Sequence, residues 1–218
     1  MTSHVLAAFK DRGEWDARRD SAYAALRARL ERARGEFVAR LTGAAPADWP
    51  RISVLVRARN DEVLIERTLA GIFSQWPQPF EVIVCDDNST DRTREVAAKF
   101  PVRFFTRPEG AYKPGKTLNA LVREAKGDVV VFNNSDAVPC DPHWLEELVK
   151  PLLGDRRVFA FANQLPRADA AMLVRKDSER AFGDGKVQAT WKFFFSLASS
   201  ATWRQNLVDV PFDEEIQY

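Results

Sequence analysis

Two stretches of the chain decide its fold class: ISVLVRARN at residues 52–60 and EVIVCDDNSTD at residues 81–91. Each opens on a run of β-branched and aliphatic residues, which is typical of a strand buried on both faces. Each run ends in charged and polar residues, and a helical pattern follows. We therefore predict buried strands at 52–56 and 80–85, with a helix between them.

The same alternation of strands and helices continues along the chain. We expect the first helix to take Asn60 as its N-cap and to run toward Gln75. Further elements are predicted as helices at 90–99, 117–126 and from 144, and strands at 102–105 and 129–132. Strands that alternate with helices are joined by right-handed crossovers into a mostly parallel sheet. The predicted fold class is α/β, with a Rossmann-like sheet flanked by helices.

The composition excludes several kinds of protein. The 32 Lys and Arg residues nearly balance the 31 Asp and Glu residues, so the net charge is +1 and no excess of cations points to nucleic acid. The hydrophobic share of 45% is that of a globular chain, which excludes general disorder. Cys85 and Cys140 cannot build a disulfide framework, and no apolar run approaches the roughly 20 residues that span a bilayer. We expect a cytoplasmic protein.

Residues 1–45 differ from the rest and predict an amphipathic helical extension. Apolar side chains recur there at spacings of three and four, at Ala22, Leu26, Leu30, Ala33, Phe37 and Leu41. Two interpretations stay open: the helix packs on the main domain or on a second copy, or its arginines meet an anionic membrane surface at the inner face of a membrane. The main domain is predicted to cover residues 46–218.

Polar side chains follow three of the predicted strands. Ligands bind beyond the carboxyl ends of the strands in an open parallel sheet. An ordinary turn with a helix cap would explain one such end, but three ends in one sheet favour a binding site. The candidates are Arg57, Arg59 and Asn60 after the first strand, Asp86 and Asp87 after the second, and Asn134, Ser135 and Asp136 after the fourth.

The stretch GAYKPGKT at residues 110–117 fits the pattern of a phosphate-binding P-loop. Pro114 removes one of the backbone N–H donors that such a loop needs, and the next strand ends in Asn133, where an aspartate would hold magnesium. Because of these two departures, a P-loop nucleotide hydrolase or kinase is the alternative function and not the first one. A second interpretation needs no P-loop: Lys113 or Lys116 approaches a diphosphate from a loop.

Several motifs together resemble the family-two glycosyltransferases of the GT-A fold. They are ISVLVRARNDE, EVIVCDDNSTDRT, GKTLNALVREAKGDVVVF and SDAVPCDPHWLEELVKPLL, in this order. The later stretches NQLPRADA and FFFSLASSATWR resemble the rhamnosyltransferase-like branch. The resemblance covers residues 52–218 and implies a GT-A domain that takes a sugar from a nucleotide donor.

The resemblance also implies roles at the strand ends. Arg57, Arg59 and Asn60 would contact the nucleotide, and the pair Asp86 and Asp87 would recognise its base and ribose. A carboxylate suits the imide N–H of uracil or thymine, so the expected donor is a UDP- or dTDP-sugar.

The phosphate side of the site is implied in the same way. Lys113 and Lys116 would lie near the diphosphate. Asn134, Ser135 and Asp136 stand where the family carries its metal-binding DxD motif, with asparagine in place of the first aspartate. Asp136 is then the one anionic ligand for a Mg²⁺ or Mn²⁺ ion, which would need the diphosphate as co-ligand, so the altered motif leaves both metal-dependent and metal-independent transfer open.

The implied reaction is inverting transfer to a saccharide or lipid-linked saccharide in polysaccharide synthesis. The family's general base is expected just beyond Tyr218, with Asp213 and Glu214 as alternatives. Candidates for the acceptor side are Gln164, Arg167, Trp191 and Trp203. A catalytically inactive nucleotide-sugar-binding module is the third possibility, because an aspartate of the DxD motif and the base are both missing.

Overall fold

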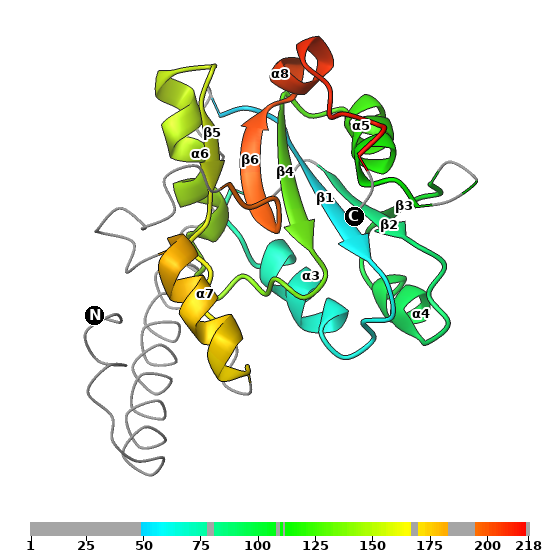
Figure 1. Cartoon of the computed structure of the whole chain (residues 1–218). Coiled ribbons are helices and arrows are strands. Elements are labelled where there is room, and N and C mark those ends of the chain that lie inside the picture. The colour runs from blue at the N-terminus through cyan, green and yellow to red at the C-terminus, as the bar shows by residue number, and fades with distance from the viewer. Residues whose placement is uncertain are drawn as a thin grey trace, which may run out of the picture.

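The computed structural model describes residues 49–77, 81–107, 110, 112–166, 170–182 and 195–216 (Figure 1). The strands are β1 (Ile52–Ala58), β2 (Glu81–Asp86), β3 (Arg103–Phe105), β4 (Val129–Asn134), β5 (Phe159–Phe161) and β6 (Ser199–Trp203). The helices are α3 (Ile65–Phe73), α4 (Thr93–Ala97), α5 (Pro114–Glu124), α6 (Trp144–Gly154), α7 (Met172–Phe182) and α8 (Arg204–Asp209). The predicted extension at residues 1–45 lies outside the described residues.

One sheet of six strands forms the centre of the fold, in the order β3-β2-β1-β4-β6-β5. The strands β3, β2, β1 and β4 are parallel, whereas β6 is antiparallel to β4 and β5 is antiparallel to β6. This confirms the α/β class with a mostly parallel sheet. We predicted no strand at β6, because four of its five residues, SSAT, are small and three of them are polar, yet Ser199, Ser200 and Thr202 are all buried.

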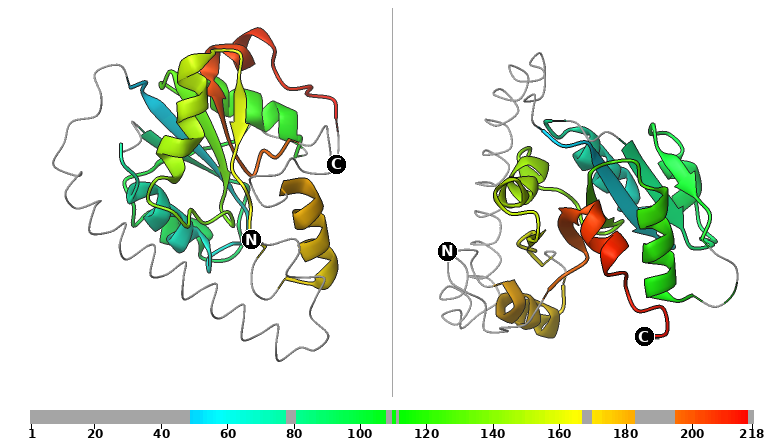
Figure 2. Two further views of the ribbon diagram at one scale, coloured as in Figure 1. Left: turned by 90° about the vertical axis from the view of Figure 1, so that its left-hand side faces the viewer. Right: turned by 90° about the horizontal axis from the view of Figure 1, so that it is seen from above.

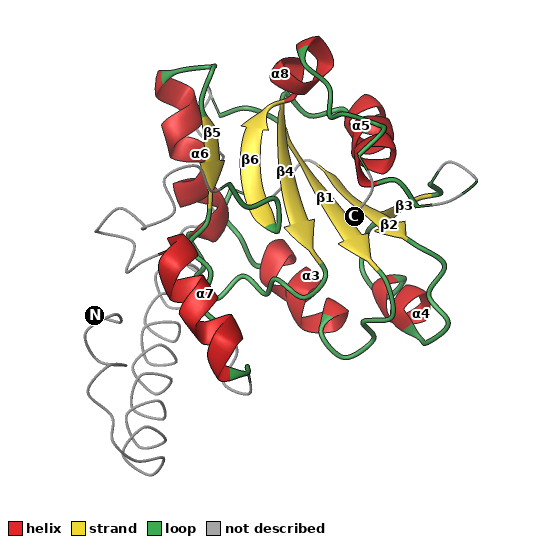
Figure 3. Ribbon diagram, in the orientation of Figure 1, coloured by secondary structure: helices red, strands yellow, loops and turns green. Residues whose placement is uncertain are grey.

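Helices cover both faces of the sheet (Figures 2 and 3). Side chains alternate along a strand, so Val54 and Val56 of β1 belong to one core cluster and Leu55 to the other. The first cluster takes side chains from α3, α4 and α6, and the second takes side chains from α5 and α8. Because both faces are covered, β1 is buried at every position except Arg57, which is partly buried.

Three predicted helix starts are wrong. Helix α4 begins at Thr93 rather than at Thr90. Asn60 is not an N-cap, because it has a φ of 50°, in the left-handed region that asparagine tolerates, and α3 begins at Ile65. Helix α5 begins at Pro114 rather than at Thr117. Proline suits the first position of a helix, where its missing N–H would have no intrahelical partner. The three residues before Thr117 therefore belong to the helix.

The parallel strands begin at one edge of the sheet, which we call the amino edge, and two backbones approach each other closely there. Gly127 precedes β4, and its N–H donates to Ser53 Oγ at 2.8 Å. A Cβ on Gly127 would lie 2.6 Å from the backbone nitrogen of Ser53 and 2.8 Å from the carbonyl oxygen of Arg51. Only glycine fits this approach of two backbones. Within the described ranges, no helix is long and apolar enough to cross a membrane.

Candidate functional site

The loops that follow β1 and β2 are hydrogen-bonded to each other at the opposite edge, the carboxyl edge. The Asn60 N–H donates to Ser89 Oγ at 2.9 Å, and the Thr90 N–H donates to Asn60 Oδ1 at 2.7 Å. One step further, the Glu62 N–H donates to Asp91 Oδ2 at 3.1 Å. Reciprocal bonds of this kind fix the two loops relative to each other, so they form one wall beside the strand ends.

The acidic side chains farthest along these loops, Glu62 and Asp91, form their hydrogen bonds within that wall. Hydrogen bonds from Arg92 lower the pKa of Glu62, first through the backbone N–H. The Thr93 hydroxyl lowers the pKa of Asp91 in the same way, at 2.5 Å from its Oδ1. The turn interpretation of DDNSTD therefore holds for its second half, whereas Asp86 and Asp87 stand closer to the strand.

Asp87 is held between two arginines. Arg107 pairs with its Oδ1, Arg59 Nη1 lies 3.5 Å from its Oδ2, and the Asp87 N–H donates to the carbonyl of Ala58 at 2.9 Å. The Asp87 side chain is 12% exposed, so its carboxylate is fixed but still reaches the surface. The neighbouring Asp86 accepts the Ser89 hydroxyl at 2.5 Å.

Arg107 is a site residue that we did not predict from the sequence. It follows β3 by two residues and therefore lies at the same edge as the ends of β1 and β2. Its Nη1 also donates to the carbonyl of Gly110 at 2.8 Å. The signal was present: an arginine just past the end of a third parallel strand, where polar residues gather.

Arg57 and Asn134 bridge the ends of β1 and β4. They are register partners, and Arg57 Nη2 donates to Asn134 Oδ1 at 2.7 Å. The Ser135 N–H donates to the Arg57 carbonyl at 3.0 Å, and the Thr68 hydroxyl donates to the Ser135 carbonyl at 2.6 Å. The amide of Asn134 is thus engaged by a guanidinium at the position where an acid was expected.

The donor set for a divalent metal is correspondingly small. Among the described residues, no group of three or more His, Cys, Asp or Glu side chains gathers in one place. Asp136 is exposed and forms no hydrogen bond or ion pair with another residue that the structure describes. One carboxylate fits a Mg²⁺ or Mn²⁺ ion only where substrate phosphates and water supply the other oxygens, an arrangement that is usual for Mg²⁺.

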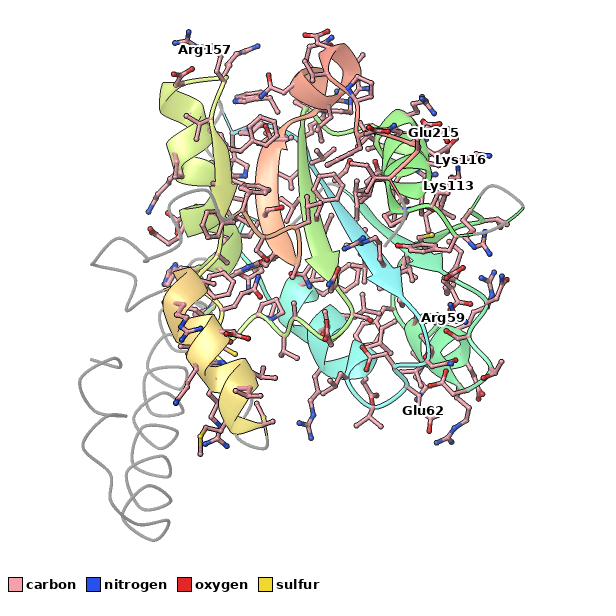
Figure 4. The ribbon with its side chains drawn as sticks, viewed as in Figure 1. Arg59, Glu62, Lys113, Lys116, Arg157 and Glu215 are labelled. Carbon is pink, nitrogen blue, oxygen red and sulfur yellow. The ribbon has the colours of Figure 1, made fainter. Side chains whose placement is uncertain are left out.

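The first turn of α5 carries the two predicted lysines (Figure 4). Lys113 is the N-cap residue, and its Nζ lies 3.0 Å from Glu215 Oε2. Lys116 is exposed, and among the described residues it has no hydrogen-bond or ion-pair partner. Figure 4 shows Lys113, Lys116 and Glu215 gathered beside α5.

The C-terminal segment, residues 212–215, lies against the same helix. Asn119 is 3% exposed; its Nδ2 donates to the Phe212 carbonyl and its Oδ1 accepts the Phe212 N–H, both at 2.9 Å. A Cβ on Gly115 would lie 1.9 Å from the carbonyl oxygen of Asp213. Gly115 and Lys113 of GAYKPGKT thus lie against the acidic residues 213–215, which gives no support to the P-loop alternative.

Of the four predicted acceptor-side residues, the structure describes Gln164 and Trp203. Gln164 Nε2 donates to Ser196 Oγ at 2.7 Å. Trp203 pairs with Val129 at the start of β4, so the structure places it at the amino edge, opposite to the strand ends at Arg57 and Asn134. Its Nε1 donates to the Leu152 carbonyl at 2.9 Å, and the Arg156 guanidinium covers its ring at 4.4 Å. Arg167 and Trp191 lie outside the described residues.

Comparison with known proteins identifies the family. The family described as Glycosyl transferase family 2 matches residues 53–210. The chain belongs to glycosyl transferase family 2. The match runs from β1 to the end of α8 and so includes the three strand ends, Lys113 and Lys116.

Curated relatives of this family 2 chain include two bacterial enzymes. The probable glycosyltransferase YdaM of Bacillus subtilis is 33% identical over 134 residues, which are 57% of this chain and 31% of YdaM. The O-antigen chain rhamnosyltransferase WbaN of Salmonella anatum is 35% identical over 102 residues, 46% of this chain and 32% of WbaN. The chain thus spans about a third of the length of these relatives.

Solved structures confirm the GT-A fold of this family 2 chain. Glucosyl-3-phosphoglycerate synthase from Mycobacterium tuberculosis, solved with UDP, has a TM-score of 0.56 and 26% identity over 82% of this chain and 63% of that one. The mannosyltransferase PcManGT from Pyrobaculum calidifontis, with GDP-Man and Mn²⁺, has a TM-score of 0.58 at 24% identity over 90% of this chain and 57% of that one. The second likeness bears on the fold alone.

Proposed function

We propose that the chain is the donor-binding part of an inverting glycosyltransferase. The donor is a UDP- or dTDP-sugar, and the acceptor is a saccharide or lipid-linked saccharide in polysaccharide synthesis. The observation that carries the proposal is the placement of charged residues in a family 2 sheet: Arg57 and Asp87 at the ends of β1 and β2, and Lys113 at the start of the helix that follows β3. UDP in a solved relative and the rhamnosyltransferase WbaN support the donor class and the branch.

The nucleoside occupies the wall formed by the first two loops. Asp87, held by Arg59 and Arg107, keeps its remaining lone pairs for the imide N–H of uracil or thymine. Asp86 accepts a hydroxyl of the ribose. A cytosine or adenine edge offers an amino group with a ring nitrogen acceptor beside it, which a carboxylate satisfies less well.

The diphosphate lies toward α5 and the end of β4. Catalysis of sugar transfer requires stabilisation of the negative charge on the departing diphosphate. Lys113 and Lys116 supply cations there, and Arg57 lies at the adjoining strand end. A Mg²⁺ or Mn²⁺ ion held by Asp136 would add a Lewis acid to the same phosphates; the Mn²⁺ in a solved relative with UDP-glucose supports this.

Transfer needs a base that takes the proton of the acceptor hydroxyl as its oxygen attacks the anomeric carbon. The diphosphate leaves from the opposite face, so the configuration inverts. We propose an acid following Tyr218 as this base, with Asp213 and Glu214 as the alternatives within the chain. Gln164 is proposed to face the sugar or the acceptor.

Ligand binding tests the proposal. Isothermal titration of the chain with UDP, dTDP, GDP and ATP, each with and without Mn²⁺, should show binding of UDP or dTDP in preference to ATP. Preference for ATP with no response to UDP or dTDP would contradict the proposal and restore the P-loop alternative. Sugar transfer by the chain would exclude an inactive binding module.

A further inference from the structure

The ion pair between Lys113 and Glu215 sits where the proposed donor must bind its diphosphate. Lys113 Nζ lies 3.0 Å from Glu215 Oε2, and the Glu215 side chain is 85% exposed. An exposed pair of this kind contributes little to folding stability and exchanges readily for another anion. The Glu215 carboxylate also resembles a phosphate group, because both offer anionic oxygens to the Lys113 ammonium.

The segment that carries Glu215 is anchored independently of this ion pair. Asn119 forms hydrogen bonds with Phe212 and with Glu214 Oε1, the latter at 2.9 Å. The Phe212 ring packs edge-on against Phe132 of β4, with 5.8 Å between the ring centroids. Glu215 can therefore leave Lys113 while the backbone before it stays in place.

We propose that Glu215 sets the affinity of the nucleotide site by competing with the donor diphosphate for Lys113. This inference rests on the proposed function. The diphosphate displaces the Glu215 carboxylate from Lys113. The net free energy of binding is therefore reduced by the energy needed to break the existing ion pair. Lys116 has no such competitor among the described residues and binds phosphate without this cost.

A substitution series on the whole chain tests the proposal by titration with UDP. Glu215→Gln keeps the shape of the side chain and removes its charge, and it should lower the Kd for UDP about two- to fivefold, the range expected for an exposed ion pair. The Kd for uridine, which has no phosphate, should not change. Glu124→Gln removes the same charge from an exposed pair with Arg103 at the far end of α5 and should leave the Kd for UDP unchanged.

A second background separates competition from a general change in field. In a Lys113→Ala chain, Glu215→Gln should no longer tighten UDP binding, because the contested partner is absent. An unchanged or weaker affinity of Glu215→Gln, or an equal gain in the Lys113→Ala chain, would overturn the proposal and leave the proposed function standing. A wild-type chain that binds neither UDP nor dTDP would overturn both.

Discussion

The two edges of the sheet both carry charged side chains, but they use them differently. At the amino edge, Asp128 accepts the Arg51 guanidinium at 3.1 Å on one oxygen and the Arg51 N–H at 3.1 Å on the other. Glu81 accepts the Ser53 hydroxyl and the Lys126 N–H, and pairs with Arg103. At the carboxyl edge, Asp136 and Lys116 have no partner among the described residues.

The difference shows that charge at a strand end does not by itself mark a site. The Arg51 side chain lowers the pKa of Asp128, because the carboxylate accepts its hydrogen bonds and so links the starts of β1 and β4. A candidate site needs charge that is held in place and still available, as with Asp87 between its arginines or the exposed Lys116. On this account the charged pairs of the amino edge stabilise the fold, and the carboxyl edge is the proposed donor site.

The largest expected effect is on ligand binding at the carboxyl edge. Asp87→Ala removes the proposed acceptor of the imide N–H and should weaken UDP binding about a hundredfold, the size of a lost hydrogen bond to a charged group. The affinity for inorganic pyrophosphate should persist. Asp128→Ala, the matched change at the amino edge, should lower the unfolding midpoint and leave the Kd for UDP unchanged. Equal losses of UDP affinity in both variants would remove the distinction between the edges.

At the amino edge, Gly127→Ala should be the most destabilising single change. Its Cβ would meet the Ser53 backbone at 2.6 Å, and neither backbone can move without disturbing the sheet. Overpacking of this kind costs about 1–3 kcal/mol of unfolding free energy, measurable by urea denaturation. Gly154→Ala, where no atom lies within 4 Å of the added Cβ, is the control and should be nearly neutral. A stable Gly127→Ala chain would contradict this account of the packing.

A smaller effect is expected where the chain end packs on α5. In Gly115→Ala the new Cβ would lie 1.9 Å from the Asp213 carbonyl oxygen, so residues 212–215 should be displaced. Asp213 and Glu215 are exposed, so this segment is less closely packed than the sheet and the expected loss of stability is only about 1 kcal/mol. The Phe212 amide, which donates to Asn119 Oδ1, should exchange its hydrogen faster. Unchanged protection of that amide would show that the segment tolerates the methyl group.

The smallest expected effect depends on pH. Burial raises the pKa of Glu81, but hydrogen bonds from the Lys126 N–H, the Ser53 hydroxyl and Arg103 outweigh it, so the pKa is lowered overall. A lowered pKa in the folded state stabilises the fold above the unfolded-state value, near 4.3, and this contribution is lost as the pH falls through the folded-state pKa. Glu81→Gln should cost about 1 kcal/mol at pH 7 and less at pH 3, by urea denaturation. An equal cost at both pH values would contradict the ionic origin.

Much of this contrast could be predicted from the sequence, because apolar runs and their polar ends are local signals. The strand ends at Arg57, Asp86 and Asn134 were found in this way. The antiparallel strand β6 was not, because its buried serines read as polar loop residues. The contacts of Asn119 and Glu215 with residues about a hundred positions away carry no local pattern. The pairing of Trp203, an acceptor-side candidate, with Val129 at the amino edge could not be predicted for the same reason.

Hydrogen–deuterium exchange with and without saturating UDP tests the division between the edges most directly. The account predicts added protection at residues 57–62, 86–91 and 113–117, which lie at the carboxyl edge and on the first turn of α5. Residues 49–53 and 126–129, at the amino edge, should exchange at the same rate in both states. Protection centred on the amino edge, or UDP binding with no protection at the three carboxyl-edge stretches, would contradict it.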